Sequence, residues 1–290
     1  MSSVQYQGAG WRLSAASVRG KSHIDADLPN QDSVHVATSE AGDVVCAVVA
    51  DGAGSAPRSG EGSTLASKHI AAYMCNFGIS RSGSQPTVDE FRFAVERSIE
   101  EVRTALATEG APLSQFHSTC VVWLALPTKA YIAQIGDSVA MSTLFGWAGE
   151  AGDEVDFFPE GRHTVHEADR GEYANETHFL TECDWRAHLR VAEVDPKVDA
   201  VLLMTDGAMD VALVRGQVFR GFLSNLVGKL LTLDERAERD QSLEAWLGAP
   251  QTYPLTGDDK TIFVAIRSTA TDWTGHPICL SQEATITEAG

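Results

Sequence analysis

Four aspartates stand at places where an apolar run meets a glycine-containing turn. They are Asp51 in VVADGAGS, Asp137 in AQIGDS, Asp206 in LLMTDG and Asp258 in GDDKTIFVAI. Carboxylates that lie within a few ångströms of one another repel, so such a group is unfavourable unless a cation neutralises it. Because oxygen ligands without Cys or His select hard divalent ions, these residues predict a site for Mg²⁺ or Mn²⁺ rather than for zinc.

An Asp-Gly pair is also an ordinary turn sequence, and a strand-to-helix turn is the better explanation of Asp51 when it is taken alone. We assign Gly42-Asp43 and Gly152-Asp153 to surface turns on this ground. The four aspartates differ from these pairs because each adjoins an apolar run that is typical of a buried strand. Strand ends that are far apart in the sequence can meet in space, so the four carboxylates can converge.

The spacing of apolar residues predicts the strands and helices that must position these aspartates. Apolar runs predict strands over residues 11–18, 33–37, 44–50, 118–126, 131–135, 139–145, 199–204 and 261–266. Helical spacing predicts helices over residues 60–77, 87–106, 218–231 and 234–247. Thr87 and Glu90 form a capping-box signature at the start of the second helix. The three strands within residues 118–145 predict an antiparallel meander with tight turns.

The order of these elements predicts an α+β fold of one domain. Helices that segregate from antiparallel strands favour sheets packed on each other, with helix pairs on the outside. We expect the domain to span residues 1–267, with a flap-like insertion near the acidic, irregular segment 149–197. Residues 268–290 are polar and predict a loose C-terminal tail.

Composition limits the class of protein and its partners. The chain has 290 residues, 43% of them hydrophobic, and 22 basic against 40 acidic residues give a net charge of −18. This charge disfavours nucleic acid and anionic membranes as partners. The five cysteines are scattered without a CxxC pair, and the N-terminus lacks a secretory signal pattern. We therefore expect a cytoplasmic protein that acts as a monomer.

Five motifs in this order resemble those of the type-2C metal-dependent protein phosphatases, the PPM family: VVADGAGS…SGEGS, STCVVWLAL, AQIGDSVAM, LLMTDGAMD and GDDKTIFVAI. The opening SVRGKSHIDADLPNQDS is similar to the start of a compact bacterial branch of that family. The resemblance covers about residues 14–267. It implies a central antiparallel β-sandwich flanked by helix pairs, four layers in the order αββα. It also implies a two-metal centre at one end of the sandwich and activity on phosphoserine and phosphothreonine.

The resemblance also implies a role for each matching position. Asp51 would bridge two Mn²⁺ or Mg²⁺ ions, and the carbonyl of Gly52 would bind one of them. Asp206 would help to complete the shell of the first ion. Asp32, in the NQD segment, would act through water, and Asp137 would hold an optional third ion.

Two adjacent aspartates compete for one further ligand position. Asp258 would complete the same shell, but Asp259 stands where many relatives have Asn, so the two are alternatives and we favour Asp258. The implied reaction is an in-line attack on phosphorus by a water that the ions activate, without a phosphoenzyme. Consistent with this, the sequence has no Ser-His-Asp order and no Cys in a glycine-rich anion loop.

The chain departs from the family pattern at two positions. Many relatives grip the phosphate with an Arg of the first motif, where this chain reads GKSH, so His23, with Lys21 nearby, would take that place. A surface loop histidine is the alternative. Some relatives have a His after the Asp-Gly pair as a general acid, and here that residue is Ala53. Arg58 is a second candidate for clamping phosphate, with a solvated loop charge as the alternative.

The function that these observations favour is that of a Mn²⁺/Mg²⁺-dependent serine/threonine protein phosphatase. Its partners would be a phosphorylated protein substrate and a cognate Ser/Thr kinase. Two alternatives stay open at this point. One is an inactive relative that binds phosphoproteins as a regulatory module, and the other is a metal hydrolase of small phosphoesters.

Overall fold

Two five-stranded antiparallel sheets form the centre of the computed structural model, which describes residues 10–81, 83–148, 154–166, 177–214 and 217–268. The first sheet has the order β1 (Trp11–Val18), β14 (Lys260–Arg267), β11 (Ala200–Met204), β6 (Val139–Thr143) and β9 (His163–His166). The second sheet has the order β10 (Arg190–Val194), β5 (Ala130–Ile135), β4 (Cys120–Ala125), β3 (Val45–Ala50) and β2 (Ser33–Thr38).

The two sheets pack face to face, and alternation along each strand divides its side chains between two apolar layers. In β3, Val49 belongs to the core between the sheets, whereas Val48 belongs to the core beneath the helices. Trp123 of the second sheet meets Phe263 of the first sheet between them, with ring centroids 5.7 Å apart. Buried strands of this kind explain why the runs in the sequence are continuously apolar rather than alternating.

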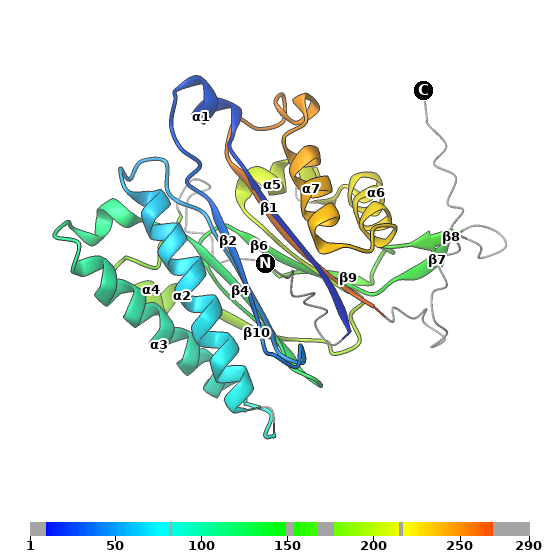
Figure 1. The fold of residues 1–290 in the computed structure, drawn as a ribbon, viewed down its shortest axis with the longest axis horizontal. Coiled ribbons are helices and arrows are strands. Elements are labelled where there is room, and N and C mark those ends of the chain that lie inside the picture. Colours follow the sequence, from blue (N-terminus) through cyan, green and yellow to red (C-terminus); the bar gives the residue numbers. More distant parts are fainter. Residues whose placement is uncertain (1–9, 82, 149–153, 167–176, 215–216, 269–290) are drawn as a thin grey trace.

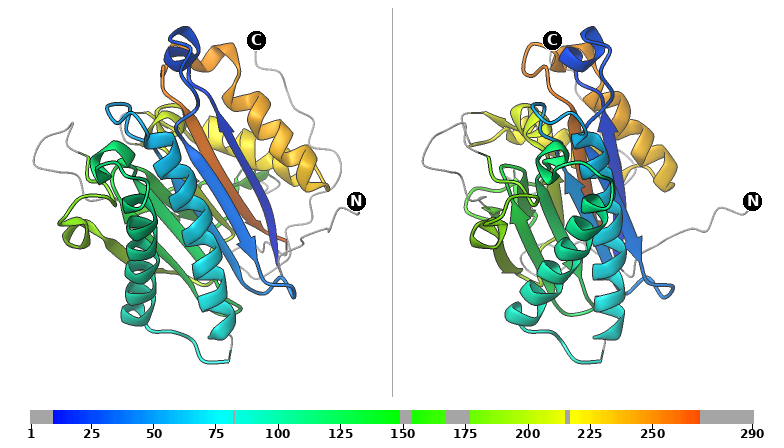
Figure 2. Two further views of the ribbon diagram at one scale, coloured as in Figure 1. Left: turned by 60° about the vertical axis from the view of Figure 1, so that its left-hand side comes forward. Right: turned by 90° about the vertical axis from the view of Figure 1, so that its left-hand side faces the viewer.

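A pair of helices covers the outer face of each sheet (Figures 1 and 2). Helices α2 (Ser59–Ser80) and α3 (Val88–Ala107) pack on the second sheet, and α6 (Arg220–Leu231) and α7 (Arg236–Leu247) pack on the first. The capping box that Thr87 and Glu90 predict is present at the start of α3. The predicted α+β fold, a four-layer αββα sandwich, is therefore confirmed.

Shorter elements complete the described part of the chain. They are α1 (Lys21–Asp25), α4 (Trp185–His188), α5 (Asp206–Ala212), the 3₁₀ turns η1 (Leu113–Phe116) and η2 (Pro250–Thr252), and the small hairpins β7 (Gly146–Ala148) with β8 (Glu154–Asp156) and β12 (Leu213–Val214) with β13 (Gln217–Val218). No helix within the described ranges is long and apolar enough to cross a lipid bilayer.

One expectation about chain organisation is wrong. Residues 118–145 do not form one meander, because β4 and β5 pair in the second sheet while β6 pairs with β11 in the first. In the described parts of segment 149–197, where we expect a flap-like insertion, β9 and β10 extend one edge of each sheet. The remainder of that segment and residues 269–290 of the expected tail lie outside the described residues. Strand partners are set by distant parts of the chain, which local patterns do not reveal.

The strand registers bring several connections to one end of the sandwich. In the first sheet Val18 pairs with Lys260, and Met204 pairs with Val139. In the second sheet the equivalent pairs are 33 with 50 and 120 with 135. The segments that leave or enter the strands at these residues include α1, which lies at the top of the molecule in Figure 1. The four aspartates singled out in the sequence all lie in these connections.

Candidate metal centre

Asp51 follows β3 directly, and its backbone is held on both sides. Its N–H donates to Thr119 Oγ1 at 3.1 Å, and its carbonyl accepts from the Thr119 N–H at 2.9 Å. The Thr119 hydroxyl also pairs with Ser138 Oγ at 2.9 Å, which links the start of β4 to the start of β6. These bonds fix the main chain from which the Asp51 carboxylate projects.

Gly52 allows two chain segments to approach more closely than any other residue would permit. A Cβ on Gly52 would lie 2.5 Å from the carbonyl oxygen of Gln31 and 2.9 Å from the carbonyl carbon of Ser59. Glycine is therefore required at this position because a Cβ would collide with neighbouring backbone atoms, and not because of its backbone angles. This approach places the Asp51-Gly52 pair beside the residue that precedes Asp32.

Asp206 begins α5 two residues after β11, and its carboxyl hydrogen-bonds that of Asp51. Its Oδ1 accepts from the Gly207 N–H at 2.6 Å. Burial, with the negative charges of Asp258 and Asp137 nearby, raises the pKa of Asp206 to about 6. The pKa of Asp51 is raised still further, first by burial and then by the charges of its neighbours, Asp32 among them.

Asp32 precedes β2 and is held by a threonine of the opposite sheet. Thr205 Oγ1 donates to Asp32 Oδ2 at 2.9 Å and accepts from the Thr261 N–H at 3.0 Å. Burial raises the pKa of Asp32 to about 8 in spite of these hydrogen bonds, and the charges of Asp259 and Asp206 add to the effect.

Asp137 lies where the chain crosses from β5 in the second sheet to β6 in the first. Its Oδ2 accepts from Thr177 Oγ1 at 2.5 Å. Its charge raises the pKa of both Asp51 and Asp206, so it belongs to the same group. We call the five residues Asp32, Asp51, Asp137, Asp206 and Asp258 the carboxylate cluster.

Asp258 and Asp259 point into different surroundings. Asp258 is exposed, and its Oδ1 accepts from the Asp259 N–H at 2.8 Å. Asp259 is only 2% exposed and accepts from Gly20 N–H at 2.6 Å, Gln31 N–H at 2.6 Å and His23 Nδ1 at 2.9 Å. The structure therefore brings Asp258 to the open side of the cluster and encloses Asp259 behind it.

His23 lies in the short helix α1. Its ring is held by Asp259, and ligand atoms of His23, Asp258 and Asp259 all lie within 4.8 Å of one another. In the described residues this is the one group of three His, Cys, Asp or Glu side chains whose ligand atoms lie so close together, and it shares Asp258 with the carboxylate cluster. The side chain is 13% exposed, so the ring is anchored and not a free surface histidine.

Arg58 is not brought into the cluster. Its guanidinium pairs with Glu61 at 2.6 Å and with Glu109 at 3.3 Å, and its Cζ lies 4.4 Å from the centroid of the Phe116 ring. These contacts hold the loop after Asp51 against the end of α3. They do not support the predicted clamping of phosphate by Arg58.

Several residues that support the cluster were missed in the sequence. They are Thr119, Thr177, Thr205 and Thr261, which bond to the aspartates or to one another, and Lys260, which is fully buried. Burial lowers the pKa of Lys260, while the charges of Asp259, Asp258 and Asp32 act in the opposite direction. A lysine directly after Asp-Asp at a strand start was the only signal in the sequence. Threonines near a strand end are too common to have pointed to such a role.

The carboxylate cluster fits hard divalent cations. Its donors are oxygen atoms, and burial together with the negative charges of neighbouring aspartates raises the pKa of Asp32, Asp51 and Asp206. Two buried polar atoms close by, Gln31 Oε1 and Ser59 Oγ, also have no hydrogen-bond partner. Both observations are expected where ions and their water would complete the interactions.

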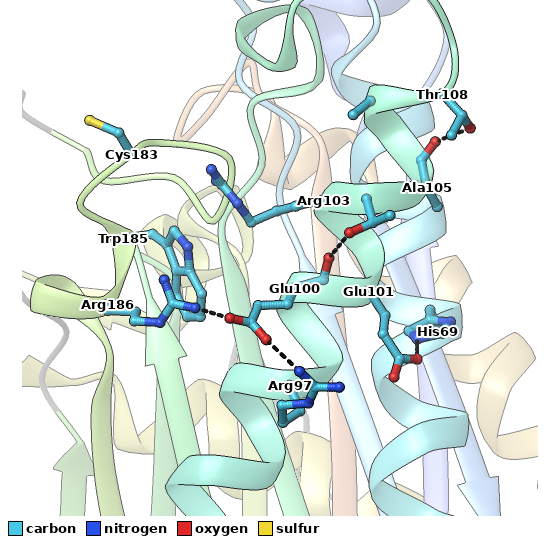
Figure 3. A pocket seen from close by; sticks show the side chains of 12 residues that line it. His69, Arg97, Glu100, Glu101, Arg103, Ala105, Thr108, Cys183, Trp185 and Arg186 are labelled. Atoms are coloured by element: carbon cyan, nitrogen blue, oxygen red, sulfur yellow. Dashed lines mark hydrogen bonds and ion pairs between the residues drawn. The ribbon is translucent and has the colours of Figure 1, made fainter.

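A surface hollow lies along α3, away from the carboxylate cluster. It has a volume of about 830 Å³ and is lined by Arg97, Arg103 and Arg186 together with Trp185 (Figure 3). Arg97 and Arg186 pair with Glu100, and Arg103 donates to the carbonyl oxygens of residues 180 and 182. Because each of these cations is already engaged, the hollow offers no comparable chemistry.

The chain is similar to known proteins in sequence and in fold. A family model described as protein phosphatase 2C matches residues 19–248. Serine/threonine-protein phosphatase 3 of Escherichia coli (strain K12) is 28% identical over 269 residues, which cover 88% of this chain and 98% of that protein. A serine/threonine phosphatase of Mycobacterium tuberculosis is similar in structure, with a TM-score of 0.53 at 16% identity over 89% of this chain and 99% of that one. Serine-threonine phosphatase 2C of Toxoplasma gondii gives 0.55 at 12% identity, over 89% and 95%. At these identities the two structures show a shared fold.

Proposed function

The chain belongs to the protein phosphatase 2C family, and we propose that the carboxylate cluster is the centre at which it hydrolyses phosphoserine and phosphothreonine in proteins. The protein is a serine/threonine protein phosphatase, and members of this family depend on metal ions. The observation that carries the site assignment is the convergence of five aspartates, from five separate connections, at one end of the sandwich.

We propose that two Mn²⁺ or Mg²⁺ ions occupy the cluster. Asp51 would be shared between them, and the Gly52 carbonyl would bind one ion. Asp206 and Asp258 would complete one shell, because the charge of Asp258 raises the pKa of Asp206 and Asp258 is open to solvent. The neighbouring Asp32 would act through water. Asp137 would hold a third ion, since it lies in the connection from β5 to β6 and its charge raises the pKa of Asp51 and Asp206.

When bound, the ions supply a water nucleophile and neutralise the charge that builds on the phosphoryl oxygens. The chain's own contribution is to hold its carboxylates in place through buried threonines and to bind the substrate. We propose that His23 contacts the phosphoryl group, because Asp259 engages Nδ1 and leaves Nε2 for a ligand. Ala53 supplies no proton, so no side chain of that loop is assigned as the acid.

The test is turnover of a phosphopeptide panel and of a small aryl phosphate, with Mn²⁺ or with chelator. We expect metal-stimulated release of phosphate from the peptides, and losses of at least about 100-fold in kcat for Asp51→Asn and Asp206→Asn. The charge-matched control is Glu40→Gln, in the exposed turn between β2 and β3. Absence of turnover in the wild type would favour a phosphoprotein-binding module. Turnover of the aryl phosphate alone would favour a small-molecule hydrolase.

The remaining proposals concern the location of the enzyme, its oligomeric state and its partner. We propose a cytoplasmic monomer that opposes a cognate Ser/Thr kinase. The location is supported by the four cysteines of the described residues, Cys46, Cys75, Cys120 and Cys183, which are free thiols. Titration of thiols in freshly isolated protein and light scattering of the purified chain test the location and the monomer. Dephosphorylation of a co-expressed kinase tests the partner.

A further inference from the structure

Asp259 is the most completely engaged carboxylate at this end of the sandwich. Its Oδ1 accepts from the Gly20 N–H at 2.6 Å, and its Oδ2 accepts from the Gln31 N–H at 2.6 Å and from His23 Nδ1 at 2.9 Å. The side chain is 2% exposed. Two donors on one oxygen use both of its lone pairs, so Oδ2 has no capacity left for an ion.

The three donors belong to one segment, residues 20–31, which leaves β1 and returns to β2. Gly20 is its first residue, Gln31 its last, and His23 lies in the helix α1 between them. One carboxylate therefore ties both ends of the segment, and its histidine, to the connection that enters β14. Since Asp32 follows Gln31 directly, the position of Asp32 also depends on this carboxylate.

Backbone contacts show that the segment is packed tightly against residues 257–259. The Ser22 N–H donates to the Gly257 carbonyl at 2.9 Å, and a Cβ on Gly20 would lie 2.2 Å from the carbonyl carbon of Asp258. A Cβ on Gly207 would lie 2.0 Å from the Asp259 carbonyl oxygen on the other side. The backbone of residues 258 and 259 is thus packed closely against Gly20 and against Gly207, and the Asp259 side chain is almost completely buried.

Asp258 has the opposite character. It is exposed, and the hydrogen bond described for its carboxylate comes from the Asp259 N–H at 2.8 Å. Its charge also raises the pKa of Asp206. A carboxylate with free lone pairs that faces other carboxylates is suited to an ion, whereas a buried carboxylate that already accepts three hydrogen bonds is suited to orienting its neighbours.

We propose that Asp259 is a positioning residue and not a metal ligand: it holds residues 20–31 in place and orients His23, so that Nε2 faces the substrate. A carboxylate beside Nδ1 fixes the proton on that nitrogen and leaves Nε2 for the ligand. The part that concerns His23 and the substrate rests on the proposed function. The part that concerns metal binding does not.

The first test is calorimetric titration of the purified chain with Mn²⁺, which needs no turnover. We expect Asp258→Asn to weaken one binding event by at least about tenfold, and Asp259→Asn to keep the wild-type stoichiometry with an affinity within about threefold. Loss of one bound Mn²⁺ in Asp259→Asn would overturn the proposal. Thermal melting of each variant shows whether it is folded before titration.

The second test is a double-mutant cycle with a phosphopeptide substrate. We expect Asp259→Asn and His23→Ala each to raise KM by about tenfold or more with a smaller change in kcat, and the double variant to be little worse than either one. Residues that act through one contact are not additive, whereas independent effects multiply. Multiplied effects would therefore overturn the orienting role.

A third measurement uses only the wild-type protein. It therefore tests the proposal even if the Asp259→Asn variant does not fold. Nitrogen-15 spectra of the His23 ring, with and without diamagnetic Mg²⁺, report which ring nitrogen carries a proton. We expect Nδ1 to carry a proton in both states, and an unprotonated Nδ1 would overturn the proposal. If the wild type fails to hydrolyse any phosphopeptide, the proposed function falls, but the titration and the spectra still decide the role of Asp259.

Discussion

Replacing Asp206 by Asn should stabilise the metal-free protein while it destroys the enzyme. In the folded chain the pKa of Asp206 is about 6, against an ordinary value of 3.8, because the carboxyl is buried among other acids. A raised pKa in the folded state means that folding is favoured while the group is protonated. That stability is present below pH 3.8 and is lost as the pH rises to about 6.

The size of the effect follows from the shift. About two pKa units at 1.36 kcal/mol each correspond to roughly 3 kcal/mol of unfolding free energy that the wild type lacks above pH 6. Asn removes this cost and keeps an Oδ1 that can accept from the Gly207 N–H. The charge repulsion is shared between Asp206 and Asp51, so the variant does not regain all of this free energy. We expect Asp206→Asn to raise the unfolding free energy by about 1–3 kcal/mol at pH 8, and by less than about 1 kcal/mol at pH 4.5.

The assay is urea unfolding, followed by circular dichroism, in chelator at pH 8 and pH 4.5 and in millimolar Mn²⁺ at pH 8. With metal the order should reverse, because an ion at 100 times its Kd adds about 2.7 kcal/mol to the wild type, and the variant binds it poorly. The control Glu40→Gln should change the unfolding free energy by less than about 0.5 kcal/mol in every condition. If Asp206→Asn proves less stable than the wild type in chelator at pH 8, the reasoning is refuted.

Three further variants test the surroundings of the cluster. Gly52→Ala should lower the unfolding free energy by more than about 2 kcal/mol and weaken Mn²⁺ binding, because its Cβ would lie 2.5 Å from the Gln31 carbonyl oxygen; unchanged melting would contradict this. Thr205→Val removes the donor to Asp32 and should destabilise by about 1–3 kcal/mol, with reduced kcat, whereas Thr205→Ser should retain most of both. Arg58→Ala should change kcat/KM by less than about threefold, since glutamates already engage the guanidinium; a loss above about tenfold would restore Arg58 as a phosphate clamp.

Local patterns determined much of the fold. Continuous apolar runs predicted the buried strands to within a residue or two, as for β3 and β11, because burial on both faces leaves no room for polar side chains. The capping box at Thr87 and Glu90 located the start of α3, because both of its hydrogen bonds are local. Features that depend on a few neighbouring residues can be predicted from those residues.

The sheet that each strand joins was decided by the tertiary structure. Nothing in residues 139–143 distinguishes a third strand of a meander from a strand that pairs with β11 in the other sheet. The edge strands β9 and β10 were likewise hidden in an irregular, acidic segment, since an edge strand needs little apolar patterning of its own. Pairing depends on partners far away in the sequence, so it became visible only in the assembled sheets.

The residues of the candidate site were likewise determined partly by local sequence and partly by tertiary contacts. The sequence by itself determined which carboxylates stand at strand ends, Asp51 and Asp206 among them, because the combination of apolar run, Asp and Gly is local. Only the tertiary structure distinguished Asp258 from Asp259, since two adjacent aspartates look alike until one of them meets three donors from a distant segment. Residue type and position at a strand end determine that a carboxylate is available for metal binding. The contacts made across the sandwich determine which of two adjacent aspartates is free to bind the metal.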